Sequence, residues 1–422
     1  MSNIKAKELL NKAITLMPRA CQTMSKCYMM WVLNDVFPIY AESQDGCIMT
    51  SVDGDKFIDM MGALGPNFVS QKIVNKAILE QLKKGIAFSL STPLEVELAT
   101  LVKECVPCAE MMRFCKNGSD AVTAAIRIAR SYTKKEHLLM AKGGYHGWSD
   151  QFCAVSERDY GMPKIFKEYV DTFTYNDAID LEEKLKIGKY AAVIMEPTSL
   201  EEPKKGFLEK VRELCTQYGA LLIFDEMITC FRWALGGAQE YYGVIPDITT
   251  MGKAVGGGMP LAFVAGKREY MMELEQVFFS ATYFGEALSF ASGIATIKEL
   301  KKNKDKIYKH VWRQGKRFKR EFDSKCKELE INACVLGMAP RMNLKFNYED
   351  AIGVRDLFHQ EMIRRGVFMG IQIYVTWATK KKHIDKVIQA MNESLEVVAD
   401  AVHNNKLDFY LDGKRSMQIF KR

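Results

Sequence analysis

The stretch from Ala220 to Gly258 reads ALLIFDEMITCFRWALGGAQEYYGVIPDITTMGKAVGGG. Its apolar start, ALLIF, ends in the paired acids Asp225 and Glu226, and a single lysine, Lys253, stands between TTMG and AVGGG. An apolar run of this length predicts a buried strand that ends at Asp225. A buried lysine at the end of a neighbouring strand can form a Schiff base with a carbonyl compound, so Lys253 is a candidate for covalent chemistry.

The composition limits the classes of protein to consider. The chain has 422 residues, 48% of them hydrophobic, which allows a large core and two or three domains. Positive and negative side chains are interspersed, so the net charge of +7 predicts a solvated surface and no nucleic-acid partner. No run approaches the roughly 18 apolar residues of a membrane helix, so we expect a cytoplasmic protein without a membrane partner. The eleven cysteines, including the isolated pair Cys105 and Cys108, are expected to be reduced, and no metal site is predicted.

Short apolar runs alternate with helical periodicity, which predicts a mostly parallel sheet covered on both faces. The strands expected in this sheet are 111–115, 137–141, 191–195, 220–224, 248–251 and 262–265. Antiparallel strands joined by tight turns are expected within 36–60, and further strands at 331–336 and 341–346. Helices are expected at 4–17, 71–84, 94–104, 119–132, 206–217, 286–302, 304–328, 350–364 and 382–403.

The change of pattern after about residue 290 predicts a large α/β domain and a small α+β domain built from both chain ends. Residues 1–65 are expected to form an N-terminal segment and part of the small domain. Residues 66–318 are expected to form the large domain, and 319–422 the C-terminal part of the small domain.

Polar residues follow several of the predicted strands, where ligands usually bind at the edge of a parallel sheet. At the start of the helix at 119–132, Gly118 allows close approach of the backbone and Ser119 adds a hydroxyl, which is suited to a phosphate. The same turn is also typical of a plain helix cap. Tyr145 is suited to stack on a flat ring, and Glu196 ends another strand.

Asp225 and Lys253 are the two side chains suited to bind a pyridine ring and an aldehyde. A partly buried carboxylate needs a cationic partner, and a protonated pyridine nitrogen is such a partner. Lys253 would hold the cofactor as an imine and, once displaced, would move a proton as general base and acid. These are the groups that make pyridoxal phosphate an electron sink, so the sequence predicts an enzyme that handles amino groups.

The chain resembles the class III pyridoxal-phosphate-dependent aminotransferases of fold type I, and among them the glutamate-1-semialdehyde 2,1-aminomutase-like proteins. The segments that carry the resemblance include KNGSDAVTAAIRIARSYT, GGYHGWSD, AAVIMEP and FFSATYFGEALSFASGIATI, together with the stretch quoted above. The resemblance implies a seven-stranded, mostly parallel sheet and a homodimer with shared active sites. It implies that pyridoxal 5′-phosphate is bound by Gly118, Ser119, Tyr145, His146, Glu196, Asp225 and Lys253, and by Thr282 of the neighbouring subunit.

The substrate side departs from the aminomutase pattern. That enzyme has an S-P-V-R segment whose arginine meets the substrate carboxylate, whereas this chain reads LMPRACQTMSK and offers Arg19 and Lys26. After Thr282, the usual G-N-P is replaced by a segment containing Glu286, a further candidate for substrate contact. These patterns resemble a branch associated with surface-polysaccharide and modified-sugar pathways, which implies a sugar-derived or other small carbonyl substrate.

Three functions stay open at this point. The first is an aminotransferase that takes the amino group of an amino acid, such as glutamate, and gives it to a carbonyl acceptor. The second is an intramolecular aminomutase, and the third is a non-catalytic binding protein with the same fold. Glu226, Arg341 and Trp377 are further candidates for a substrate pocket, but the sequence does not place them.

Overall fold

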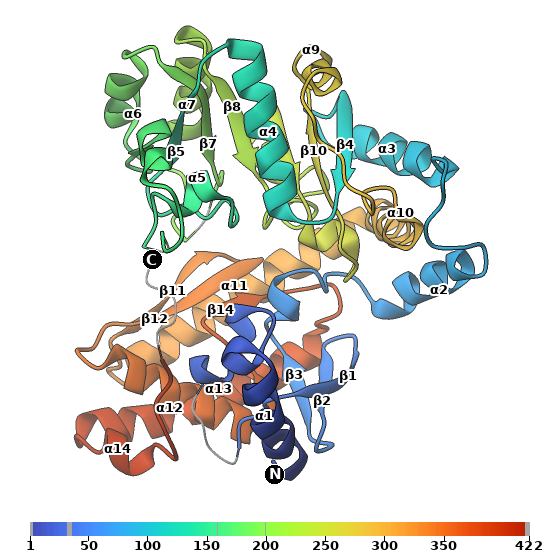
Figure 1. Ribbon diagram of the computed structural model, residues 1–422. Helices are drawn as coiled ribbons and strands as arrows, with labels where there is room; N and C mark the ends of the chain where they lie inside the picture. Colours follow the sequence, from blue (N-terminus) through green and yellow to red (C-terminus); the bar gives the residue numbers. More distant parts are fainter. Residues whose placement is uncertain (1–2, 32–35, 158, 199, 418–422) are drawn as a thin grey trace. The chain divides into compact units, whose positions relative to one another are not determined.

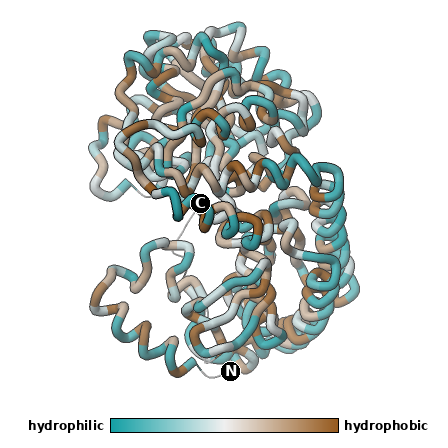
Figure 2. Tube along the Cα trace, turned by 90° about the vertical axis from the view of Figure 1, so that its right-hand side faces the viewer, coloured by the Kyte–Doolittle hydropathy of each residue, from teal (hydrophilic) through white to brown (hydrophobic). Residues whose placement is uncertain are grey.

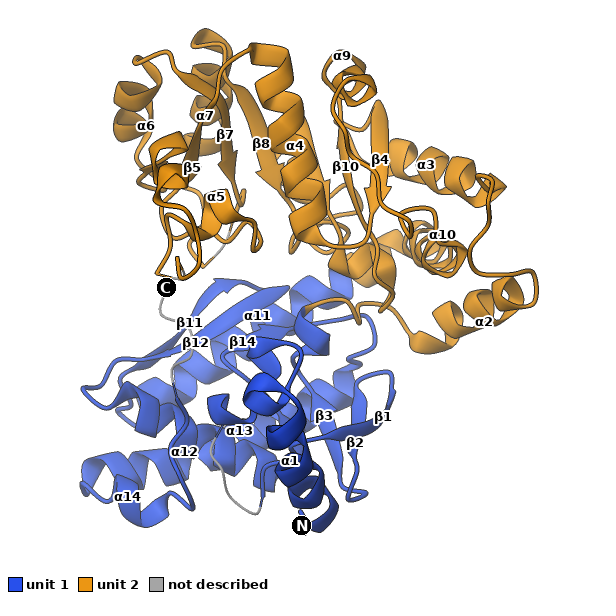
Figure 3. Ribbon diagram, viewed as in Figure 1, with its two compact units in different colours: residues 1–64, 309–421 blue, residues 65–308, 422 orange. Residues whose placement is uncertain are grey.

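The computed structural model describes residues 3–31, 36–157, 159–198 and 200–417 (Figure 1). The chain divides into two compact units, coloured separately in Figure 3: unit 1 comprises 1–64 and 309–421, and unit 2 comprises 65–308. Helix α11 (Lys304–Glu328) runs across the second boundary. These limits lie near the expected domain limits, and the assignment of the domains stays a prediction.

Unit 2 contains the predicted seven-stranded sheet, in the order β4-β10-β9-β8-β7-β5-β6. Its strands are β4 (Met111–Cys115), β5 (His137–Ala141), β6 (Val170–Phe173), β7 (Tyr190–Met195), β8 (Leu221–Asp225), β9 (Ile248–Met251) and β10 (Ala262–Gly266). The pairs that β10 forms with β4 and β9 are antiparallel and the other four pairs of this sheet are parallel, so the expectation of a mostly parallel sheet is confirmed. The sequence analysis missed β6, because VDTF is a short edge strand whose two central residues are polar.

Helices cover the sheet because its central strands are apolar on both faces. On β7, Ala192 and Ile194 pack in the cluster that includes residues of α4 (Gly118–Thr133), whereas Val193 packs with residues of α7 (Phe207–Gln217). The other helices of unit 2 are α2 (Gln71–Leu82), α3 (Pro93–Cys105), α5 (Asp150–Cys153), α6 (Ala178–Leu185), α8 (Ala238–Tyr242), α9 (Arg268–Met271) and α10 (Ala287–Lys302). The carboxyl ends of β5, β7, β8 and β9 therefore lie at one edge of a rigid layer.

Unit 1 is an α+β unit with two small sheets. One sheet has the order β1-β2-β3-β13 and the other β11-β12-β14. The strands are β1 (Ala41–Asp45), β2 (Ile48–Ser51), β3 (Lys56–Asp59), β11 (Ala333–Met338), β12 (Arg341–Phe346), β13 (Val367–Phe368) and β14 (Gln372–Tyr374). The helices are α1 (Ile4–Leu16), α12 (Ala351–Arg364), α13 (Lys381–His403) and α14 (Leu407–Tyr410), besides the unit 1 part of α11. The expected antiparallel pairing of β1 to β3 is confirmed, and β13 adds a parallel strand.

The helices mix hydrophilic and hydrophobic residues along their length (Figure 2). Within the described parts of the chain, none of them combines the length and the apolar character that a membrane crossing requires.

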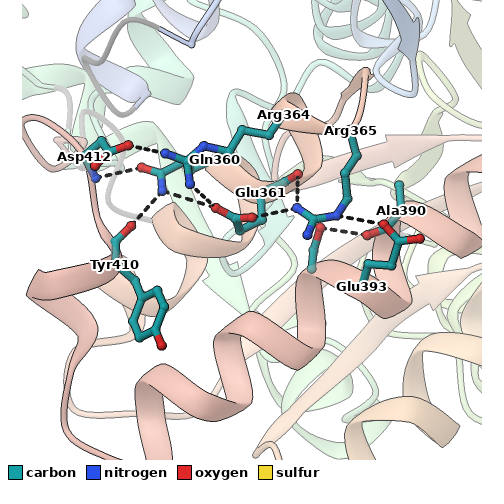
Figure 4. A network of polar contacts seen from close by, with 9 residues as sticks. Gln360, Glu361, Arg364, Arg365, Ala390, Glu393, Tyr410 and Asp412 are labelled. Carbon is teal, nitrogen blue, oxygen red and sulfur yellow. Dashed lines mark hydrogen bonds and ion pairs between the residues drawn. The ribbon is translucent and has the colours of Figure 1, made fainter.

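Glu361 on α12 is the centre of a polar network in unit 1 (Figure 4). Its carboxylate accepts hydrogen bonds from the guanidinium groups of Arg364 and Arg365. Arg365 also bonds Glu393 on α13 at 3.1 Å, and Arg364 pairs with Asp412 in the C-terminal segment. The network therefore joins α12 to α13 and to the end of the chain.

We expect Glu361→Gln to lower the free energy of unfolding by about 1–3 kcal/mol at neutral pH, because two arginines lose their shared carboxylate. Burial acts to raise the pKa of Glu361, but the hydrogen bonds and charges of Arg365 and Arg364 outweigh it and hold the pKa below its ordinary 4.5. The contribution of the carboxylate should therefore be present above about pH 4.5 and be lost as the pH falls through the lowered value.

Urea unfolding of the wild type and the variant at several pH values measures this difference. Glu393→Gln is the matched control, because Glu393 also bonds Arg365 but its side chain is 47% exposed. A loss of stability in the control equal to that of Glu361→Gln would contradict the central role of Glu361.

Candidate active site

Asp225 ends β8 as a buried carboxylate, 4% exposed. Its Oδ2 lies 2.8 Å from His146 Nδ1. Its Oδ1 accepts hydrogen bonds from the Thr250 hydroxyl and the Met227 N–H, each at 3.2 Å. Thr250 is the register partner of Asp225 on β9, so the strand pairing itself positions the hydroxyl. These three bonds leave part of the acceptor capacity of the carboxylate, roughly four lone-pair sites, for a ligand.

His146 supports Asp225 from the turn after β5. The ring is 1% exposed and packs edge-on against Phe152 with centroids 5.4 Å apart. Its second nitrogen, Nε2, is buried and has no hydrogen-bond partner in the described structure. A buried polar atom without a partner needs an explanation, and a ligand that completes the site is one.

Lys253 follows β9 and Gly252 and begins the 3₁₀ helix Lys253–Gly256. Its side chain is half-buried, and its amine makes no hydrogen bond or ion pair with any described residue. The backbone lies in the left-handed region, with φ 47°, which costs a residue with a Cβ about 1–2 kcal/mol. An unpaired, half-buried amine on a strained turn is available for covalent attachment.

The turn that carries His146 packs directly on the start of α4. Gly147 has φ +96°, and a Cβ at this position would lie 2.4 Å from Ser119 Oγ. The Trp148 N–H donates to the same oxygen at 3.1 Å. Only glycine allows this approach, so the turn and the helix start hold each other in place.

The N-terminus of α4 has the features of an anion site and of a stable cap. The Asn117 side chain accepts the Asp120 N–H at 3.0 Å, and Asp120 Oδ2 accepts the Asn117 N–H at 3.2 Å. The N–H groups of Gly118 and Ser119 belong to the first turn, where no intrahelical acceptor exists, so they can bind a phosphate. A Cβ on Gly118 would lie 3.0 Å from Met227 Sδ, so glycine also fits the packing here.

Tyr145 and Glu196 meet across neighbouring strand ends. They follow β5 and β7, which pair in parallel, and the Tyr145 N–H donates to Glu196 Oε1 at 3.3 Å. The Tyr145 side chain is 47% exposed, which leaves its ring accessible. The structure thus brings Gly118, Ser119, Tyr145, His146, Glu196, Asp225 and Lys253 into unit 2, where they follow strands of one sheet.

The remaining predicted site residues are placed differently. Thr282 is exposed in a turn before α10. Arg19 and Lys26 are exposed residues of unit 1. Glu286 is the N-cap of α10, accepts the Leu288 N–H at 2.6 Å and pairs with Lys116 at 3.0 Å. These bonds occupy the Glu286 carboxylate and give it a structural task that the sequence analysis did not foresee; its contact with substrate stays a prediction.

Glu226 is fully buried, and its carboxylate organises the following loop. It accepts hydrogen bonds from the Thr229 hydroxyl at 2.7 Å, from the Ala238 N–H, and from the Gln239 amide at 2.9 Å. Burial raises the pKa of Glu226 despite these bonds. The sequence analysis also missed Thr250. Its signal is the pairing of the strand LLIFD with the strand ITTM, which places the Thr250 hydroxyl opposite Asp225.

Comparison with known proteins identifies relatives over nearly the whole chain. The sequence matches the family Aminotransferase class-III over residues 30–395. It is 34% identical over 394 residues to the glutamate-1-semialdehyde 2,1-aminomutase of Saccharolobus islandicus (strain L.S.2.15 / Lassen #1), covering 87% of this chain and 91% of that protein.

Solved structures show the same fold at lower identity. An omega-transaminase from Sphaerobacter thermophilus superposes with a TM-score of 0.85 at 23% identity, covering 93% of this chain and 97% of that chain. A glutamate-1-semialdehyde aminomutase from Pseudomonas aeruginosa PAO1 gives 0.83 at 19% identity, covering 93% and 94%.

The fold is that of the pyridoxal-phosphate-dependent transferases of fold type I. The chain belongs to the class III aminotransferase family, and its cofactor is pyridoxal 5′-phosphate. The residues present fit this group: an unpaired amine, a buried carboxylate for a protonated ring nitrogen, and a helix start for a phosphate.

We expect Gly147→Ala to weaken binding of pyridoxal 5′-phosphate at least about tenfold, because the new Cβ displaces Ser119 and the turn that holds His146. Gly143→Ala is the matched control: Gly143 also has positive φ, +78°, but nothing lies within 4 Å of its Cβ position. Fluorescence titration of the apoprotein with cofactor measures both affinities. Equal effects of the two substitutions would show that backbone strain, rather than the contact with Ser119, decides the result.

Proposed function

We propose that this enzyme is an aminotransferase that moves the amino group of an amino acid donor, such as glutamate, to a small or sugar-derived carbonyl compound. The observation that carries the proposal is the pair of strand ends on β8 and β9: a buried, hydrogen-bonded carboxylate at Asp225 and an unpaired amine at Lys253. The exposed ring of Tyr145 adds a surface on which a flat cofactor can stack.

Each residue has a distinct task in this proposal. When bound, pyridoxal 5′-phosphate supplies a conjugated ring that accepts the electron pair released at the substrate Cα. Asp225 holds a proton on the ring nitrogen through its charge, and His146 and Thr250 fix the direction of the carboxylate. Lys253 holds the cofactor through its amine and, once free, takes the Cα proton as base and returns one as acid. Gly118 and Ser119 bind the phosphate through backbone N–H groups.

An intramolecular aminomutase is the second candidate. It is favoured by the name of the relative at 34% identity, a glutamate-1-semialdehyde 2,1-aminomutase. It would need the same Lys253 and Asp225 but would release no keto acid. The carboxylate-contacting roles of Arg19 and Lys26 belong to either candidate.

We further propose a homodimer in which Thr282 reaches the phosphate site of the partner subunit. The neighbouring side chains Phe278 and Tyr283 are 79% and 64% exposed, which is unusual for aromatic residues of a monomer and favours an interface. A cytoplasmic location is proposed because all eleven cysteines are free, although nine of them are buried.

Lys253→Ala should abolish turnover, because no other group replaces the amine as anchor and proton carrier. The holoenzyme should lose its lysine-bound visible absorption band while retaining some cofactor without a covalent bond. Lys142→Ala is the control, since Lys142 is an exposed lysine directly after β5. Activity of Lys253→Ala close to that of the wild type would refute the assignment of Lys253.

Addition of L-glutamate alone to the holoenzyme should remove the visible band and release 2-oxoglutarate in an amount equal to the active sites. This follows because an aminotransferase completes its first half-reaction without an acceptor. Absorption spectroscopy combined with quantification of the keto acid measures it. A band that persists with glutamate and with other amino acids would contradict the aminotransferase and favour the aminomutase.

A further inference from the structure

Arg341, the first residue of β12, is a buried cation without a partner. The residue is 1% exposed, and none of its three guanidinium nitrogens has a hydrogen-bond partner among the described residues. The salt bridges of the described chain also leave it without a carboxylate. A guanidinium keeps its charge in proteins, so its burial is unfavourable unless something pairs with it.

The alternation of side chains along β12 determines which face of the sheet Arg341 occupies. Successive residues of a strand point to opposite faces, so Arg341 and Asn343 share one face, and Met342, Leu344 and Phe346 share the other. The apolar face is covered by helices: the Phe346 ring lies 5.7 Å from Phe358 on α12. Arg341 therefore shares its face of the β11-β12-β14 sheet with its register partners Met338 on β11 and Tyr374 on β14, neither of which is a carboxylate; these strands are labelled in Figure 1.

Asn343 supplies a second unsatisfied group on that face. It is 8% exposed, and its side-chain oxygen is buried without a hydrogen-bond partner in the described structure. Across the strand pair, Tyr374 faces Arg341 and Gln372 faces Asn343, and the Tyr374 hydroxyl donates to Gln372 Oε1 at 3.1 Å. The two neighbours on β14 thus bond each other, and the ladder leaves Arg341 and Asn343 without such a bond.

We propose that Arg341 and Asn343 form a binding site for a small carboxylate. A guanidinium presents parallel N–H groups that match the two oxygens of a carboxylate, and the Asn343 side-chain oxygen can accept a hydrogen bond from an N–H or O–H group of the same ligand. Arg341 and Asn343 belong to unit 1, whereas the residues assigned above to the cofactor belong to unit 2.

The ligand in this proposal is a carboxylate metabolite that binds without being converted. Glutarate serves as its probe, because it has carboxylates but neither the amino nor the carbonyl group that the enzyme would act on.

The experiment is calorimetric titration of the holoenzyme with glutarate, for the wild type, Arg341→Met, Arg341→Lys and the control Lys345→Met. Lys345 lies on the same strand and face as Arg341 but is exposed. Glutarate should bind the wild type and the control equally, and both Arg341 variants at least about tenfold more weakly. Without glutarate, Arg341→Met should melt at a higher temperature than the wild type, because an unpaired buried charge has been removed.

Equal glutarate affinity in the wild type and Arg341→Lys or Arg341→Met would overturn the proposal, as would no binding to the wild type. Binding of inorganic phosphate that depends on Arg341, without binding of glutarate, would overturn the carboxylate assignment. If Arg341→Met does not fold, Arg341→Lys carries the comparison. Because glutarate binding needs no turnover, failure of the glutamate half-reaction leaves this test intact.

Discussion

The hydrogen bonds of the Asp225 carboxylate determine much of the site. A carboxylate that is 4% exposed must be satisfied by neighbours, and three different segments supply its bonds: the turn after β5, the start of the loop after β8, and β9. Because β9 is a ladder partner of β8, Thr250 cannot shift without disturbing the sheet. The cost of burying the charge is thereby reduced, and the carboxylate is held ready for a cationic ring nitrogen.

Close backbone approach is the second constraint. The contact between Gly147 and Ser119 joins two turns that follow different strands, and Gly144 has a similar task, since a Cβ there would lie 2.9 Å from His146 Nε2. Direct packing contacts therefore link the residues assigned to the phosphate, the ring and the ring nitrogen of the cofactor. A change in one turn is transmitted to the carboxylate through His146, although none of these glycines has a functional group.

Sequence patterns predicted the sheet well because buried parallel strands such as YAAVIM and LLIFD are continuous apolar runs. They did not reveal β6, whose polar centre suits an edge, nor the antiparallel direction of β10, which depends on tertiary pairing. At the site, Asp225 and Lys253 could be predicted because each follows a run that predicts a buried strand. The sequence could not show that Glu226 and Glu286 are occupied by loop and helix-cap bonds, because those partners lie at positions that only folding brings together. Arg341 could not be distinguished from a surface arginine before its burial was known.

The backbone at Lys253 adds a consequence for how this chain changes over time. A residue with a Cβ is strained at φ 47°, whereas glycine adopts this backbone conformation without that strain. Selection for stability alone would therefore replace this lysine, and only selection for chemistry opposes that drift. A duplicated copy of the chain that had been released from catalysis should lose the lysine early, so that its presence is a marker of continued use as an enzyme.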